Sequence, residues 1–301
     1  AEVQKITIPR PGHADLTGLI KYGFDDIRPV IDRSSARETA ARVAAGSLAR
    51  AFLRQLGIQI GSYISTIGPV SEAAAPASLQ ELLDAGAESL AAKADKSQVR
   101  MLDPEAETAA IAAIDQAKAD GDTLGGIVEL YITGVPMGLG SYVQHDRRLD
   151  SELAAAIMSI QAIKGVEIGP AFDNARKPGS QVHDELFTGG EKGLRRETNR
   201  AGGIEGSMSS GQPIHIRAAM KPISSLVSPL RSFDLATLEA VQSRFERSDT
   251  CAVPAAGVVA EAVVAPVIAN ALLEKLGGDH MAEIKERLEA YRAALRMRFE
   301  K

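Results

Sequence analysis

The chain has 301 residues, with 34 Lys or Arg against 39 Asp or Glu, so its formal net charge is −5. That balance argues against a general nucleic-acid-binding protein, and seven Phe, five Tyr and no Trp leave few rings for base stacking. A single cysteine, Cys251, excludes an internal disulfide and a cysteine-built zinc site. We therefore expect no metal and no nucleic-acid partner.

Hydrophobic periodicity and helix-end signals predict a mixture of helices and strands. Ser35 and Glu38 have capping-box spacing and Gly57 follows the last apolar residue of one helix, while Asp103-Pro104 opens another. The mixed order, without regular βαβ units, favours an α+β fold. In chain order we expect helix 34–56, strand 58–67, helix 104–119, strand 127–133, helix 151–163, strands 166–168 and 213–220, and helices 254–276 and 279–299.

The longest apolar stretch, residues 251–273, is interrupted by Glu261 and by Pro254 and Pro266. A membrane span rarely carries such residues, so we interpret it as a buried helix and expect no membrane partner. The first residues lack the apolar core of a signal peptide, and we expect a cytoplasmic protein. Segments 169–212 and 222–249 show no clear periodicity, which is common where loops carry function.

Two clusters near the start of the chain carry candidate chemistry. Residues 10–15, Arg-Pro-Gly-His-Ala-Asp, place Arg10 and His13 around a turn, where His13 could transfer a proton. The alternative is a surface turn with a capping Asp. Residues 33–37, Arg-Ser-Ser-Ala-Arg, stand at a predicted helix start and suit a phosphate or carboxylate. The alternative there is a cap flanked by solvated arginines.

Three further loops follow later in the chain. Residues 202–211 are rich in Gly and Ser, yet a strand rather than a helix follows them, so they match no dinucleotide fingerprint. Their glycines would let a flat ligand approach the backbone, or they form a flexible hairpin. Residues 220–225 and 247–250 each set a cation beside hydroxyls. Together the loops suit a polyanionic ligand, without naming a reaction.

Taken together and in this order, the clusters resemble the chorismate synthase family. Residues 10–15 are similar to its R-P-G-H-A-D motif, and residues 35–46 to its S-A-R-E-T helix. Residues 160–167 are similar to its [NQ]-A-x-K-G-V-E segment. Gly179-Ser180, the Gly-rich loop, Met220 to Ile223 and Arg247 to Asp249 complete a resemblance that covers essentially the whole chain.

The resemblance implies a β-α-β sandwich, with helices packed between antiparallel sheets, as a single domain over residues 1–301. It implies a lyase of the shikimate pathway that converts 5-enolpyruvylshikimate 3-phosphate into chorismate and phosphate by 1,4-anti elimination. The family requires reduced FMN and forms homotetramers, and some members also reduce FMN with NADPH.

The resemblance also implies roles for individual residues. His13 would supply or hold a proton at the pyrimidine side of the flavin, and Asp249 would be the general base. The anionic groups of the substrate would be bound by Arg10, Ser35, Arg37 and Arg247. The FMN site would be lined by Arg33, Ser34, Ser35, Gln161, Ala162, Gly206, Lys221, Pro222, Ile223, Ser224, Ser225 and Arg247.

One departure from the family pattern stands out. The family carries an N-terminal Gly-Glu-Ser-His-Gly segment with a second catalytic His, and this sequence contains no such motif. The chain therefore looks like a member lacking roughly its first quarter, and we expect it to turn over poorly by itself. The alternative function is a non-catalytic FMN- or anion-binding remnant.

Overall fold

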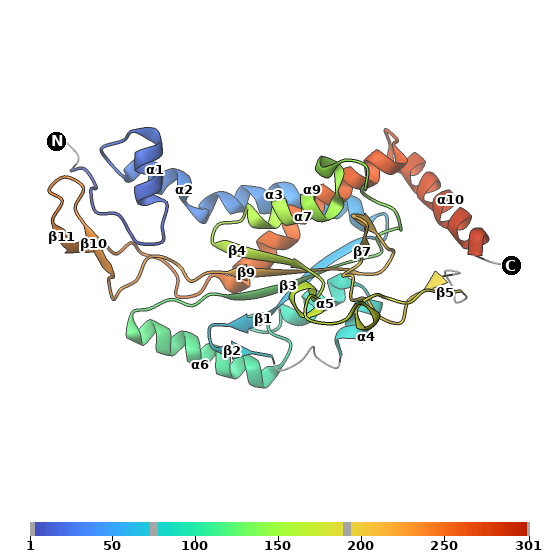
Figure 1. The fold of residues 1–301 in the computed structure, drawn as a ribbon, viewed down its shortest axis with the longest axis horizontal. Helices are drawn as coiled ribbons and strands as arrows, with labels where there is room; N and C mark the ends of the chain where they lie inside the picture. The colour runs from blue at the N-terminus through green and yellow to red at the C-terminus, as the bar shows by residue number, and fades with distance from the viewer. Residues whose placement is uncertain (1–3, 73–77, 189–193, 300–301) are drawn as a thin grey trace.

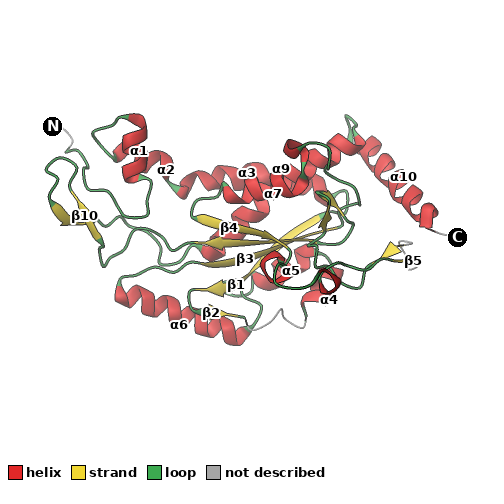
Figure 2. Cartoon of the chain, in the orientation of Figure 1, coloured by secondary structure: helices red, strands yellow, loops and turns green. Residues whose placement is uncertain are grey.

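A five-stranded antiparallel sheet forms the centre of the computed structural model, which describes residues 4–72, 78–188 and 194–299 (Figures 1 and 2). The strand order is β2–β1–β3–β9–β4, and every neighbouring pair is antiparallel. This sheet and its packed helices confirm the α+β class. The strands are β1 (Gln59–Ile67), β2 (Val70–Ser71), β3 (Gly126–Thr133), β4 (Ile163–Ile168) and β9 (Ile214–Met220).

Helices cover both faces of this sheet, which supplies one of the sheets of the expected sandwich (Figure 1). On one face lie α3 (Thr39–Arg54), α7 (Leu149–Met158) and α9 (Val253–Leu276). On the other face α4 (Leu79–Asp84) and α5 (Ala87–Ala94) pack beside β1, and α6 (Pro104–Asp120) lies beside β2. At opposite ends of the molecule are α1 (Asp15–Tyr22) with α2 (Arg28–Ser34), and α10 (Met281–Phe299).

Short elements fill the two segments that lack periodicity. Antiparallel pairs join β5 (Phe187–Thr188) to β6 (Leu194–Arg195), β7 (Ile204–Glu205) to β8 (Met208–Ser209), and β10 (Arg231–Phe233) to β11 (Ala240–Gln242). The first segment also holds the one-turn helices α8 (Ala171–Asn174) and η3 (Gly179–Gln181), and two more, η1 (Ala36–Glu38) and η2 (His145–Arg147), lie elsewhere in the chain.

Strand β9 shows why the sheet forms where the sequence predicted it. Ile214, Ile216 and Ala218 are buried against the helical layer, whereas His215 and Arg217 occupy the opposite face. This is the alternation expected of a strand with one apolar face. The strand prediction for residues 213–220 is therefore confirmed, with a start one residue later.

The apolar helix α9 is long and apolar enough to cross a membrane, but 67% of its most apolar window is buried inside the protein. Its carboxylate Glu261 is 3% exposed and accepts hydrogen bonds from Ser62 (2.6 Å), Arg50 (2.8 Å) and Arg100 (3.0 Å). These partners satisfy a charge that hydrocarbon would not. The interpretation of this segment as a buried helix agrees with the structure.

Helices α3 and α9 cross at backbone contact. A Cβ atom added to Gly46 of α3 would lie 2.2 Å from the backbone oxygen of Ala262 in α9. No side chain fits in that space, so glycine sets the distance between the two helices.

The prediction of one continuous helix over residues 34–56 is wrong. Ser34 ends α2, Ser35 is extended with ψ 133°, and the chain resumes as η1 and then α3. Ser35 accepts from the backbone N–H of Arg37 as expected of a cap. Glu38 does not complete the capping box, because its carboxylate is engaged by Gln161 and Arg42 instead.

The predicted helix 151–163 also ends too late. Helix α7 stops at Met158, Ala162 turns the chain with φ 67°, and Ile163 already belongs to β4, opposite Met220. Lys164 and Gly165, which follow the predicted end of that helix, lie within β4. Pairing with β9 outweighs the helical periodicity here, since tertiary contacts override local propensity. Helices α1, α2, α4 and α5 and the short α8 were not predicted.

Candidate functional site

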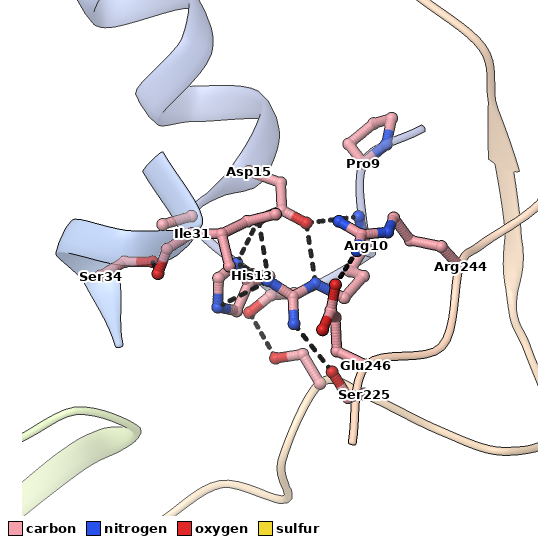
Figure 3. Close-up of polar contacts among 12 residues, drawn as sticks. Pro9, Arg10, His13, Asp15, Ile31, Ser34, Ser225, Arg244 and Glu246 are labelled. Atoms are coloured by element: carbon pink, nitrogen blue, oxygen red, sulfur yellow. Dashed lines mark hydrogen bonds and ion pairs between the residues drawn. The ribbon is translucent and has the colours of Figure 1, made fainter. Parts of the chain in front are cut away.

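The loop of residues 10–15 is built around a buried carboxylate (Figure 3). Asp15 has no exposed surface and accepts from the backbone N–H of Arg10 (3.0 Å), from its Nε (2.9 Å) and from its Nη2 (3.1 Å). His13 Nδ1 lies 2.5 Å from Asp15 Oδ1. Burial alone would raise the pKa of Asp15, but the hydrogen bonds from His13 and Arg10 hold it well below its usual range.

Because Asp15 stays ionised, it accepts the Nδ1 proton of His13 and thereby orients the imidazole ring. Nε2 is then the ring nitrogen free to exchange a proton, and it lies 3.3 Å from Arg10 Nη2. The alternative of a solvated surface turn does not hold, since Arg10 is only 7% exposed. This arrangement can hold an anion and transfer a proton at the same place.

This loop packs against residues 221–225, more than two hundred positions along the chain. Arg10 Nη1 donates to Ser225 Oγ (2.9 Å). Lys221 Nζ donates to the carbonyl of Gly12 (3.0 Å) and to Ser224 Oγ (2.9 Å), which itself donates to Gly12 (2.9 Å). Burial, and then the charge of Lys164, lowers the pKa of Lys221. A bound anion would therefore stabilise the ammonium group.

The Gln161-Ala162 turn joins this cluster to the start of α3. The backbone N–H of Lys221 donates to Ala162 O (2.9 Å). Gln161 Nε2 donates to Glu38 Oε1 (2.5 Å), and Arg42 Nε donates to Glu38 Oε2 (2.9 Å). Residues 10–15, 35–38, 161–162 and 221–225 thus form one connected network at one end of the sheet.

One buried polar atom of this network, Gln161 Oε1, and one beside it, Arg244 Nη1, have no hydrogen-bond partner among the described residues. Arg244 is paired with Glu246 and lies beside Arg10 (Figure 3), and burial, then the neighbouring Arg10, lowers its pKa. Buried polar groups normally have partners, so these atoms fit a ligand that brings both an acceptor and a donor. An organic phosphate that also carries a ring N–H supplies that combination.

The remaining predicted residues lie at different distances from this network. Arg33 and Arg37 are exposed where α2 ends and η1 begins, next to half-buried Ser34 and Ser35. Pro222 is exposed, and the carbonyl of Ile223 accepts from Thr123 Oγ1 (2.7 Å). These residues lie next to the network but are not part of the hydrogen bonds that connect it.

Arg247 and Asp249 lie on an exposed loop after β11, which Ser248 anchors through a hydrogen bond to the Ser225 carbonyl (3.2 Å). Gly206 is not brought to the network within this chain. Gly206 lies in the turn between β7 and β8, which precedes the first residue of β9. Lys221 follows the last residue of β9. Seven strand residues, about 23 Å, separate those two ends.

Sequence reasoning missed the roles of three residues. Asp15 was considered only as a cap, Glu38 only as half of a capping box, and Arg244 not at all. For Glu38 and Arg244 the signal is proximity to residues far along the chain, and for Asp15 it is complete burial of the charge; one sequence displays neither. Asp15 alone carried a hint, since it follows two basic residues within one turn.

Comparison with known proteins identifies the fold. The family model described as chorismate synthase matches residues 2–273. The chain belongs to the chorismate synthase family. It is 98% identical over 300 residues to the chorismate synthase of Chlorobaculum tepidum, covering 100% of this chain and 76% of that protein. It is 75% identical to the chorismate synthase of Chlorobium phaeovibrioides, covering 99% of this chain and 75% of the relative.

A solved structure agrees with this assignment. A crystal structure of chorismate synthase superposes with a TM-score of 0.81 and 44% identity, covering 94% of this chain and 77% of the other. The resemblance drawn from the sequence clusters is therefore confirmed at the level of the family and the fold.

Proposed function

We propose that this protein is a lyase that eliminates phosphate from 5-enolpyruvylshikimate 3-phosphate to give chorismate, with reduced FMN as cofactor. The observation that supports it best is the network that joins the cations of Arg10 and Lys221 to His13 and Ser225. Buried polar atoms that find no partner among the described residues lie in and beside it. Substrate and cofactor both carry phosphate, so bringing them together requires fixed positive charges.

The chain's own residues would divide the work. Arg10, Ser35, Arg37 and Arg247 would hold the phosphate and carboxylates of the substrate. The isoalloxazine ring and the FMN phosphate would be held by the FMN-site residues named above, with the Gln161-Ala162 turn and residues 221–225 at their centre. When bound, reduced FMN supplies an electron-rich ring that assists departure of the phosphate.

Proton transfer would fall to two side chains. His13, whose ring orientation is set by Asp15, would hold or supply a proton through Nε2 at the pyrimidine edge of the flavin. Asp249 would take the proton that leaves the substrate ring, and its loop is placed by the Ser248–Ser225 contact. Closure of that loop over the ligands would exclude water from the charges.

Gly206 would belong to the FMN site only if a second subunit brought it there, because it lies at the other end of β9 within this chain. This is compatible with the homotetramer that the family resemblance implies, which we propose together with a cytoplasmic location. Light scattering after size-exclusion chromatography measures the subunit number.

The test is an anaerobic assay of the chain with chemically reduced FMN and 5-enolpyruvylshikimate 3-phosphate, following chorismate by absorbance. We expect product at a low rate, because the sequence lacks the Gly-Glu-Ser-His-Gly motif with the second catalytic His. We expect H13A and D249N each to lower that rate by a further factor of about 10²–10⁴, the usual contribution of a general acid or base. The control D173N removes an exposed carboxylate of α8 and should leave kcat unchanged.

Flavin binding without product would identify the non-catalytic binding protein instead. Absence of both binding and product would overturn the proposal.

A further inference from the structure

A second cavity, of about 250 Å³, lies where α10 passes over the loop that follows β3. Its apolar wall includes Val135, Met137, Leu295 and Phe299. Residues 210–212, just before β9, form part of the opposite wall. Since Lys221 follows the other end of β9, this cavity is separate from the candidate active site.

The charged residues of the lining are Arg196, Arg292 and Arg296, and no carboxylate of the described residues lines it. Arg196 is already neutralised, because Glu205 accepts from its Nε (3.0 Å) and Nη2 (2.8 Å). Arg292 and Arg296 form no ion pair with any described residue. The cavity is therefore locally basic in a protein whose net charge is −5.

The two remaining arginines repel each other. They are four positions apart, on the same side of α10, an arrangement that destabilises a helix when the charges are alike. Arg292 is half-buried, and burial, followed by the charge of Arg296, lowers its pKa. A bound anion would relieve both effects, just as an acidic side chain does in an ordinary ion pair.

Contacts between α10 and the loop after β3 fix the position of α10 at the cavity. Tyr291 donates to the carbonyl of Met137 (2.9 Å), and Lys275 Nζ lies 4.2 Å from the centre of the Tyr291 ring. Arg292 Nη2 donates to the carbonyl of Gly134 (3.0 Å), which leaves its other N–H groups for a ligand. The cavity is thus formed before a ligand arrives, as small-molecule sites usually are.

We propose that this cavity binds a small organic anion, with its carboxylate on Arg292 and Arg296 and one apolar ring against Val135, Leu295 and Phe299. The guanidinium fork matches a carboxylate bidentately. Pockets for drug-sized ligands measure roughly 300–1,000 Å³, so a cavity of about 250 Å³ suits a smaller ligand such as a single-ring acid.

The experiment measures binding to the full chain by ligand-observed NMR and isothermal titration. The probe is hydrocinnamate, compared with hydrocinnamyl alcohol, which lacks the charge, and with inorganic phosphate, which lacks the ring. We expect hydrocinnamate to bind more tightly than either by about tenfold or more, because a hydrogen bond to a charged group is worth ~1.5–3 kcal/mol.

Variants locate the bound probe. R292Q and R296Q should each weaken hydrocinnamate binding by about tenfold. R298Q removes an equal charge from the same helix outside the cavity and should bind as the unmodified chain does. Arg296 is exposed, so R296Q tests the site even if R292Q fails to fold. Equal affinity for acid and alcohol, equal binding by R296Q and R298Q, or no binding of hydrocinnamate at all would overturn the proposal.

Discussion

Replacing Asp15 with Asn tests whether its carboxylate holds the candidate site together. The variant removes the charge that three Arg10 contacts and His13 share, while Arg10 stays 7% exposed without a counter-ion. Removing one partner of a buried ion pair costs ~3–5 kcal/mol. For a chain of this size each kcal/mol lowers Tm by roughly 2–4 °C, so we expect a fall of roughly 6–20 °C.

The assay is urea and thermal unfolding followed by circular dichroism, with D32N, which alters an exposed carboxylate of α2, as the control. The folded-state pKa of Asp15 is lowered, so its contribution is fully present above the unfolded-state pKa of about 3.9 and is lost as pH falls further. The gap between D15N and the unmodified chain should stay constant from about pH 5 to 8 and narrow below about pH 4. Equal stability of D15N and D32N at neutral pH would contradict a stabilising role for the Asp15 carboxylate.

The other predictions concern FMN binding at Lys221 and the packing of helices α3 and α9. K221M should weaken binding of reduced FMN by about tenfold or more in fluorescence titration, because an anion loses one charged donor, whereas exposed K118M should not. G46A should lower stability by ~1–3 kcal/mol in urea unfolding, since its Cβ would overlap the α9 backbone; G165A, whose Cβ meets a neighbour only at 3.5 Å, should be neutral. E261Q should cost ~3–5 kcal/mol by leaving two arginines of its buried network without a full counter-charge, and an unchanged urea midpoint would contradict this.

Where local chemistry decides the structure, the sequence was informative. Asp103-Pro104 opens α6 as predicted, with Asp103 accepting from the backbone N–H of Glu105, and Gly121 ends that helix with φ 73°. The alternation in β9 also identified its buried face. These features depend on neighbours a few positions away, which the sequence displays directly.

Where distant segments decide, the sequence misled. Ile163 reads as part of a helix but pairs with Met220. Ser35 reads as the cap of one continuous helix over residues 34–56, but it separates α2 from η1. The candidate site follows the same division. Its residues were named through family resemblance, whereas the burial of Asp15 and the placement of Gly206 at the far end of β9 depend on the folded chain.

The close contact between Gly46 of α3 and the backbone of α9 helps to fix the angle at which α3 crosses α9. Thr39, the first residue of α3, lies seven residues from Gly46, which is roughly 10 Å along the helix axis. If α3 tilted by about 5° at Gly46, Thr39 would move by ~1 Å. A displacement of that size in an active site can lower the catalytic rate by ~10²-fold. The small residue at position 46 thus helps to position Ser35 and Arg37, which precede α3. A larger residue at position 46 should lower turnover before it unfolds the chain.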